Sequence, residues 1–249
     1  MENSTLKVVP VIDIRNGIAV HAVKGRRSEY QPLKSVLCPS ANPLDVALTF
    51  RKLGFSELYI ADLDAILTGH PNFAVLKQIA SATGLSLMVD AGVANLERAE
   101  KLVKSNVTKV IIGTETLPRL SFVREAVETL GKKRVVVSLD LKGGEVLSGF
   151  ELGKFSSPLD LLLEFQEMGV KQVIVLDLAR VGSGEGVNTS FLASTLNNLG
   201  VKVLVGGGVR GITDLTEIRN MGTFGVLIAT ALHSGEITVE QLKQAGLFQ

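Results

Sequence analysis

The sequence lacks the features that several large classes of protein require. Its single cysteine, Cys38, excludes an internal disulfide, and its three scattered histidines predict no metal site. A net charge of +1 gives nucleic-acid binding no electrostatic support. No apolar run reaches the roughly 18 residues that span a bilayer, and the N-terminus has no signal-peptide pattern. These absences predict a cytoplasmic protein that binds neither nucleic acid nor a membrane.

An internal repeat is the most informative feature that the chain does have. Residues 11–17 (VIDIRNG) and 138–144 (SLDLKGG) each run from apolar residues into an aspartate, then a basic residue and a glycine. Asp13 and Asp140 hold the same place in the two copies. Three later pairs of segments also match: 59–63 with 175–178, 88–93 with 204–209, and 112–114 with 228–230. The chain therefore resembles a duplicated half, with a site to be expected in each copy.

Short apolar runs alternate with longer amphipathic segments along the whole chain. Near-continuous apolar runs are typical of parallel strands that are covered on both faces. The predicted strands are residues 7–13, 57–62, 86–90, 108–113, 134–140, 172–177, 202–206 and 224–229. The predicted helices are residues 44–54, 72–82, 95–105, 119–130, 158–168, 189–199, 213–221 and 238–244.

Eight such units can form an open doubly wound sheet or a closed barrel. The two-fold repeat favours the barrel, because two equal halves close a ring. We predict one α/β domain over residues 1–249, a (β/α)8 TIM barrel built from two repeated (β/α)4 halves at about 1–131 and 132–249. Residues 18–39 and 141–157 are then the loops above the mouth of the barrel.

The catalytic candidates are aspartates at strand ends. Asp13 ends the first predicted strand and Asp140 ends the fifth, on the opposite wall of the ring. Two carboxyls that face one cavity can serve as general acid and general base if burial or a neighbour raises one pKa. Each could instead cap its loop or pair with a nearby base. Asp177, at the end of the sixth strand, is a third candidate, and an ion pair with Arg180 is the alternative for it.

The phosphate-binding candidates follow other strands. Gly206, Gly207 and Gly208 follow the seventh strand, and Ala229 and Thr230 follow the eighth, where many barrels bind phosphate through backbone N–H groups. A tight turn without a ligand is the alternative.

The matching positions in the first half are Gly92, Gly113 and Thr114, which predicts a second phosphate site. There, however, Asp90 stands where the second half has Gly206. Its carboxylate would repel a phosphate unless it points away from the site, and it could instead bind a hydroxyl or an amine.

These motifs resemble a family of histidine-biosynthesis barrels that are half-barrel duplications. The family includes the phosphoribosylformimino-aminoimidazole-carboxamide ribotide isomerase and the cyclase subunit of imidazole glycerol phosphate synthase. The likeness covers the chain and rests on residues 9–17, 138–144 and 206–210, of which the second is closer to the isomerase. The resemblance implies an Amadori rearrangement with Asp13 and Asp140 as acid and base. It also implies a substrate with a phosphate at each end, and no metal or cofactor.

The chain departs from the family pattern at several positions. By the resemblance, Asp177 stands in place of a strand-end threonine, residues 181–184 replace an Asp-Gly-Thr loop, residues 90–94 replace the first glycine motif, and Ala229 replaces a glycine. These departures indicate a divergent relative, of an archaeal type, whose substrate could carry a single phosphate.

Three functions are compatible with these features. The first is an isomerase of a phosphorylated aminosugar. The second is a lyase or synthase that acts on another phosphorylated small molecule, for example in cofactor or pterin biosynthesis. The third is a cyclase-like or non-catalytic phosphate-binding subunit with a glutaminase partner. The third is disfavoured because both Asp13 and Asp140 are intact.

Overall fold

Eight parallel strands close into a ring in the computed structural model, which describes residues 6–153, 155 and 157–248. Each strand pairs with the next around the ring, and the last pairs with the first, where Lys7 lies opposite Gly225. The eight are β1 (Lys7–Arg15), β4 (Glu57–Asp62), β5 (Ser86–Asp90), β6 (Lys109–Gly113), β7 (Val135–Lys142), β9 (Gln172–Asp177), β10 (Lys202–Gly206) and β11 (Gly225–Ile228). The protein is a (β/α)8 TIM barrel, as the alternation of apolar and amphipathic segments predicted.

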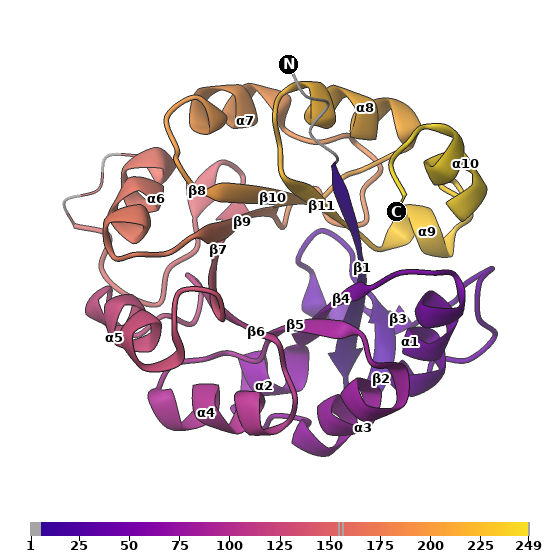
Figure 1. Ribbon diagram of the computed structural model, residues 1–249, viewed down its shortest axis with the longest axis horizontal. Helices are drawn as coiled ribbons and strands as arrows, with labels where there is room; N and C mark the ends of the chain where they lie inside the picture. The colour runs from indigo at the N-terminus through magenta and orange to yellow at the C-terminus, as the bar shows by residue number, and fades with distance from the viewer. Residues whose placement is uncertain (1–5, 154, 156, 249) are drawn as a thin grey trace.

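Helices cover the outside of the ring (Figure 1). They are α1 (Pro43–Lys52), α3 (Phe73–Thr83), α4 (Leu96–Lys104), α5 (Ser121–Leu130), α6 (Pro158–Glu167), α7 (Thr189–Leu196), α8 (Ile212–Asn220) and α10 (Val239–Gln244). Several begin where the sequence indicated: Asn95 and Ser157 accept hydrogen bonds from the first turns of α4 and α6. Within the described ranges, no helix combines the length and the apolar character needed to cross a bilayer.

Short elements extend the ring at its mouth. Strand β1 continues into an antiparallel hairpin with β2 (Ile18–His21), which pairs in turn with β3 (Gln31–Pro32). A 3₁₀ helix, η1 (Arg27–Glu29), lies between β2 and β3, and β7 continues into β8 (Glu145–Val146). Two short helices that the sequence did not predict, α2 (Leu63–Thr68) and α9 (Thr230–His233), follow β4 and β11.

The two faces of the strands bury different clusters. Side chains that point into the ring, such as Val9, Met88 and Ile174, form an inner core. Side chains that point outward pack under the helices around Phe50 and Phe165. Burial of each large apolar side chain contributes roughly 1.5–3 kcal/mol, which holds the strand ends at the mouth in place.

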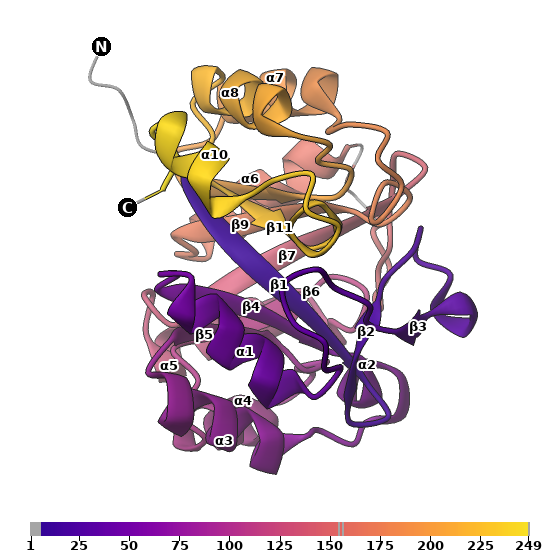
Figure 2. The same ribbon diagram turned by 90° about the vertical axis from the view of Figure 1, so that its right-hand side faces the viewer.

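Strands β1 and β7 are the first and fifth of the ring, so Asp13 and Asp140 lie on opposite walls. Figure 2 shows the indigo-to-magenta first half of the chain and the orange-to-yellow second half on opposite sides of the molecule. The division into half-barrels near residues 131 and 132 stays a prediction.

Candidate active site

A cavity of about 270 Å³ opens at the carboxyl ends of the barrel strands. Strand ends and loops from both halves contribute to its wall, as expected for a TIM barrel. Its lining includes the charged or hydroxyl-bearing side chains of Asp13, Arg27, Tyr30, Tyr59, Asp90, Glu115, Asp140, Ser183, Thr230 and Glu236, together with Gly206, Gly207, Gly208 and Ala229. The cavity therefore combines a carboxyl-rich wall with a glycine-rich one.

Asp13 and Asp140 both line this cavity, as the sequence predicted. Asp140 is 4% exposed; its Oδ1 accepts a hydrogen bond from Ser138 Oγ (2.7 Å) and its Oδ2 accepts one from the Glu115 backbone N–H (3.3 Å). Desolvation raises the pKa of Asp140 to about 6 against the opposing effect of the Ser138 hydrogen bond. Desolvation also raises the pKa of Asp13 to about 7, although the charge of Arg27 lowers it in part.

A third carboxyl, that of Asp90, joins the two predicted ones. Asp90 is 7% exposed, and its Oδ1 accepts a hydrogen bond from the Gly92 backbone N–H (3.0 Å). Its Oδ2 and the Oδ2 of Asp140 each lie 3.0 Å from the point where a Cβ of Gly113 would sit. The two oxygens are thus no farther apart than twice that distance, and the missing side chain of Gly113 leaves room for both.

Burial, followed by the charge of Asp140, raises the pKa of Asp90 to about 7. The sequence predicted that Asp90 would disfavour a phosphate and could instead bind a hydroxyl or an amine. Its position at the end of a predicted strand was the sequence signal that could have placed it in the cavity. In the structure Asp90 ends β5 and lines the cavity, as Asp13 also does.

Arg27 and Tyr59 complete the carboxyl-rich wall. The Arg27 guanidinium donates two hydrogen bonds to Glu115, of 2.8 Å from Nη1 to Oε1 and 2.5 Å from Nη2 to Oε2. This pair joins the loop after β1 to the loop after β6. Tyr59 is 4% exposed, and its pKa is raised well above the usual value by burial and then by Asp90, Asp140 and Asp13. Tyr59 therefore stays neutral at physiological pH.

The glycine-rich wall requires glycine for steric reasons. Gly207 has φ +104°, and a Cβ there would lie 2.4 Å from the Asp177 carbonyl oxygen. Gly208 has φ +87°, and its Cβ would lie 2.3 Å from the Gly186 carbonyl oxygen. Backbone without side chains thus borders the cavity next to Thr230, the first residue of α9. Such a surface can accept a small anion through N–H groups.

The residues of the phosphate site predicted for the first half lie away from the cavity. Gly92, Gly113 and Thr114 are not among the residues that line the cavity. Thr114 is fully buried, and its Oγ1 accepts a hydrogen bond from the Asp140 backbone N–H (3.0 Å). A Cβ at Gly92 would lie 3.0 Å from the Cα of Ile66. These three residues therefore do not face the open space of this cavity, and a phosphate site in the first half stays a prediction.

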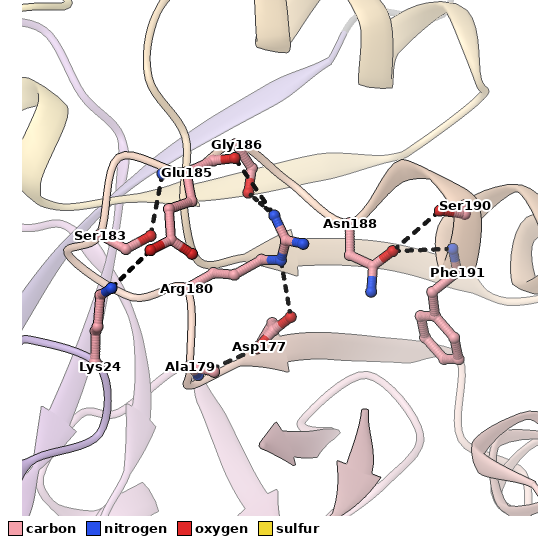
Figure 3. Close-up of polar contacts among 10 residues, drawn as sticks. All are labelled: Lys24, Asp177, Ala179, Arg180, Ser183, Glu185, Gly186, Asn188, Ser190 and Phe191. Carbon is pink, nitrogen blue, oxygen red and sulfur yellow. Dashed lines mark hydrogen bonds and ion pairs between the residues drawn. The ribbon is translucent and has the colours of Figure 1, made fainter. Parts of the chain in front are cut away.

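The structure places Asp177, the third predicted catalytic residue, outside the cavity. Its Oδ2 lies 3.3 Å from Arg180 Nε and its Oδ1 accepts a hydrogen bond from the Ala179 N–H (3.1 Å), as Figure 3 shows. Side chains alternate along β9, so Leu176 lines the cavity and Asp177 faces the helices outside the ring, beside Leu192. The alternative ion pair with Arg180 is therefore the one observed.

The loops after β1 and β9 meet across the mouth. Lys24 Nζ lies 2.6 Å from Glu185 Oε1 (Figure 3), and the Lys24 N–H donates to the Val181 carbonyl oxygen (2.7 Å). Arg180 Nη1 donates to the Gly186 carbonyl oxygen (2.9 Å), which holds the β9 loop against its own strand. The first loop is thus attached to both halves of the barrel, through Lys24 and through Arg27.

A family model described as histidine biosynthesis protein matches residues 7–238. The chain belongs to this family. An uncharacterized protein of Methanocaldococcus jannaschii is 37% identical over 239 residues, which cover 95% of this chain and 97% of that protein.

Other members of the family carry an enzyme name. The protein named 1-(5-phosphoribosyl)-5-((5-phosphoribosylamino)methylideneamino) imidazole-4-carboxamide isomerase in Bacillus cereus is 31% identical over 242 residues, or 96% of this chain and 98% of its own. The protein of the same name in Streptococcus sanguinis is 31% identical over 244 residues, or 97% and 98% of the two chains. The resemblance stated from the sequence motifs is confirmed, and the chain has isomerase homologues.

Proposed function

We propose that this protein is an isomerase that converts a phosphorylated aminoaldose into an aminoketose by an Amadori rearrangement. The observation that carries the proposal is the placement of two carboxyls, those of Asp13 and Asp140, in one cavity on strands that face each other across the ring. Their pKa values of about 7 and about 6 suit proton transfer near neutral pH. Family members named as isomerases of a phosphoribosylated carboxamide support the same reaction class.

The proposed reaction moves only protons within the substrate. One carboxyl protonates the ring oxygen as the bond between that oxygen and C1 breaks, which leaves a protonated imine at C1. The other carboxyl, as the carboxylate, removes the proton on C2, and the electron pair forms a C1–C2 double bond while the nitrogen becomes neutral. The enaminol then takes a proton at C1, and its C2 hydroxyl loses one to become the ketone. The product is an isomer, so the protons and electrons balance without an external oxidant or reductant.

The glycine-rich wall would hold the phosphate of the substrate. Gly206, Gly207 and Gly208 present backbone without side chains to the cavity, and Ala229 and Thr230 lie beside them. Backbone N–H groups bind phosphate oxygens without a charged side chain. The sugar carbons would then lie toward Asp13 and Asp140, at the other side of the cavity.

The reaction class can be tested with a simple aminoaldose phosphate. Aniline and ribose 5-phosphate condense to an N-phenyl-5-phosphoribosylamine, which has the reactive carbons and one phosphate. In D₂O the wild type should form the 1-phenylamino-1-deoxyribulose 5-phosphate with one deuterium at C1, as read by NMR. Asp13→Asn and Asp140→Asn should each lower the rate by about 10²–10⁴-fold. Binding of this compound without formation of any ketose would overturn the proposal.

The substrate named for the relatives needs its own test. A bacterial histidine auxotroph that lacks the isomerase can be transformed with this chain. Growth with the wild type and not with Asp13→Asn would assign that substrate to the protein. No growth, despite well-folded protein, would exclude that substrate and leave the reaction class to the deuterium experiment.

Asp90 favours a second candidate function. It gives the cavity a third carboxyl, which a lyase or synthase on another phosphorylated small molecule could use. Cleavage or formation of a carbon–carbon bond in the NMR experiment, in place of a ketose, would support this candidate. No specific observation in the described part of the chain favours a cyclase-like or non-catalytic subunit with a glutaminase partner.

A further inference from the structure

The wall of the cavity opposite the glycines contains acidic side chains at the matching position. In the repeat, Asp90 of β5 corresponds to Gly206 of β10, and both residues line the cavity. Where the second half presents bare backbone, the first half presents the Asp90 carboxyl next to that of Asp140, above Gly113. The two walls therefore differ in charge although they come from equivalent strands.

Two largely buried residues on this wall carry a polar atom whose hydrogen-bonding capacity no described residue uses. Tyr59 is 4% exposed and lines the cavity, and among the described residues its hydroxyl has no hydrogen-bond partner. Asp90 is 7% exposed, and within the same described residues only its Oδ1 is hydrogen-bonded, by Gly92. Neither atom is among the fully enclosed polar atoms without a partner, so both reach the open cavity, where a ligand can hydrogen-bond to them.

The balance of charge on this wall excludes a second phosphate. Arg27 is the cationic side chain in the lining, and both of its terminal nitrogens already donate to Glu115. That pair is neutral as a whole, so the carboxyls left over on this wall are those of Asp13, Asp90 and Asp140. A phosphate dianion placed there would be repelled, whereas an ammonium group would be attracted.

We propose that Asp90 and Tyr59 form a subsite for a protonated amine at the end of the substrate remote from the phosphate. This inference rests on the proposed function for the position of the phosphate and of the reacting carbons. It deepens that function by naming the substrate class: an aminoaldose with one phosphate and one ammonium end. A substrate with a phosphate at each end does not fit it.

A series of three stable compounds tests the subsite. Reduction of the imines that ribose 5-phosphate forms with substituted anilines gives 1-arylamino-1-deoxyribitol 5-phosphates, which cannot isomerise. The para substituent is aminomethyl, methyl or phosphonomethyl, so only the charge at the remote end changes. Calorimetry at pH 7 should show the aminomethyl compound bound at least about tenfold more tightly than the methyl compound, and the phosphonomethyl compound bound most weakly.

Variants assign the preference to named residues. In Asp90→Asn, the affinities for the aminomethyl and methyl compounds should lie within about twofold of each other. Tyr59→Phe should reduce the ratio of these two affinities about threefold. Asp177→Asn is the matched control, because this strand-end aspartate lies outside the cavity, and it should keep the full preference. The affinity for inorganic phosphate, measured on every variant, checks that the fold and the glycine wall are intact.

The subsite is overturned if the methyl or phosphonomethyl compound binds the wild type as tightly as the aminomethyl compound. It is also overturned if the preference survives Asp90→Asn in protein that still binds inorganic phosphate. If Asp90→Asn does not fold, an unchanged preference in Tyr59→Phe overturns it. These compounds cannot react, so their binding is measured independently of catalysis. A preference for the aminomethyl compound in a protein without isomerase activity would contradict the proposed function and still support the subsite.

Discussion

The two halves of the barrel mouth come from equivalent strands and present opposite chemistry. Strand β10 ends in Gly206 and leads into bare backbone, whereas β5 ends in Asp90, whose carboxyl meets that of Asp140. Asp13 and Asp140, by contrast, occupy equivalent places in both halves and reach the same cavity. The barrel thus keeps its candidate catalytic pair symmetrical and differs at the flanking strand ends, where contacts with a substrate's two ends would be made.

The largest effect should come from the symmetrical pair. Asp140→Asn or Asp13→Asn should lower the isomerisation rate by about 10²–10⁴-fold, since each removes one proton carrier. In the wild type the rate should fall below pH 6, where the base becomes protonated, and above pH 7, where the acid loses its proton. NMR rates on the phenylamine compound between pH 5 and 9 check this. A flat profile, or an equal loss in Asp177→Asn, would contradict it.

The next largest effect should separate the two glycine motifs. Gly207→Ala should weaken inorganic phosphate binding about a hundredfold, because the new Cβ would lie 2.4 Å from the Asp177 carbonyl oxygen and displace the wall. Gly92→Ala also places a side chain at positive φ, +58°, but away from the cavity. It should lower the melting temperature and leave phosphate affinity within about threefold. Calorimetry with inorganic phosphate measures both affinities. Equal losses of affinity in the two variants would indicate a phosphate site in the first half.

The fold was predictable because its signals are local and repeated. Apolar runs located every barrel strand, and the two matching motifs paired Asp13 with Asp140 across the ring. The sequence did not reveal that Asp177 points away from the cavity, because that depends on which residues of β9 face the inside of the ring. The inward and outward faces of β9 alternate, and an apolar run that is buried on both faces does not reveal which residues point into the ring.

Long-range contacts were beyond the sequence for a different reason. Arg27 meets Glu115 from a loop 88 residues away, and neither segment contains a pattern that names its partner. Thr114 matched a phosphate motif by position, yet it is buried and its Oγ1 accepts a hydrogen bond from the Asp140 backbone N–H. Local sequence predicts strand ends, whereas packing between loops decides which of those residues reach the cavity.

A smaller effect should appear in the pH dependence of stability. Folding raises the pKa of Asp90 from 3.8 to about 7, so the folded protein holds a proton that the unfolded chain releases. This pKa difference destabilises the folded protein. The destabilisation is absent below the pKa of the unfolded chain and grows as the pH rises toward 7. Asp90→Asn removes it, so its free energy of unfolding relative to the wild type should increase between pH 4 and pH 8, on the order of 2 kcal/mol.

Asp214→Asn is the control with the opposite trend. Burial alone would raise the pKa of Asp214, but hydrogen bonds from Arg210 and its charge lower it on balance. That carboxylate stabilises the fold above its unfolded pKa and loses its effect as the pH falls through the lowered value. Asp214→Asn should therefore be destabilising at pH 7 and nearly neutral at low pH. Urea unfolding across the pH range distinguishes the two, and parallel trends would refute the assignment for Asp90.

The smallest effect should distinguish the two attachments of the first loop. Arg27 and Glu115 form a bidentate pair with side chains 21% and 30% exposed, whereas Lys24 and Glu185 form a single contact at 35% and 53%. A double-mutant cycle on Arg27→Gln and Glu115→Gln should give a coupling energy of about 1 kcal/mol in urea unfolding. The cycle on Lys24→Gln and Glu185→Gln should give none above experimental error, because exposed pairs are screened by solvent. The reverse ranking would mean that the loop is held by the glycine-rich half rather than by the acidic one.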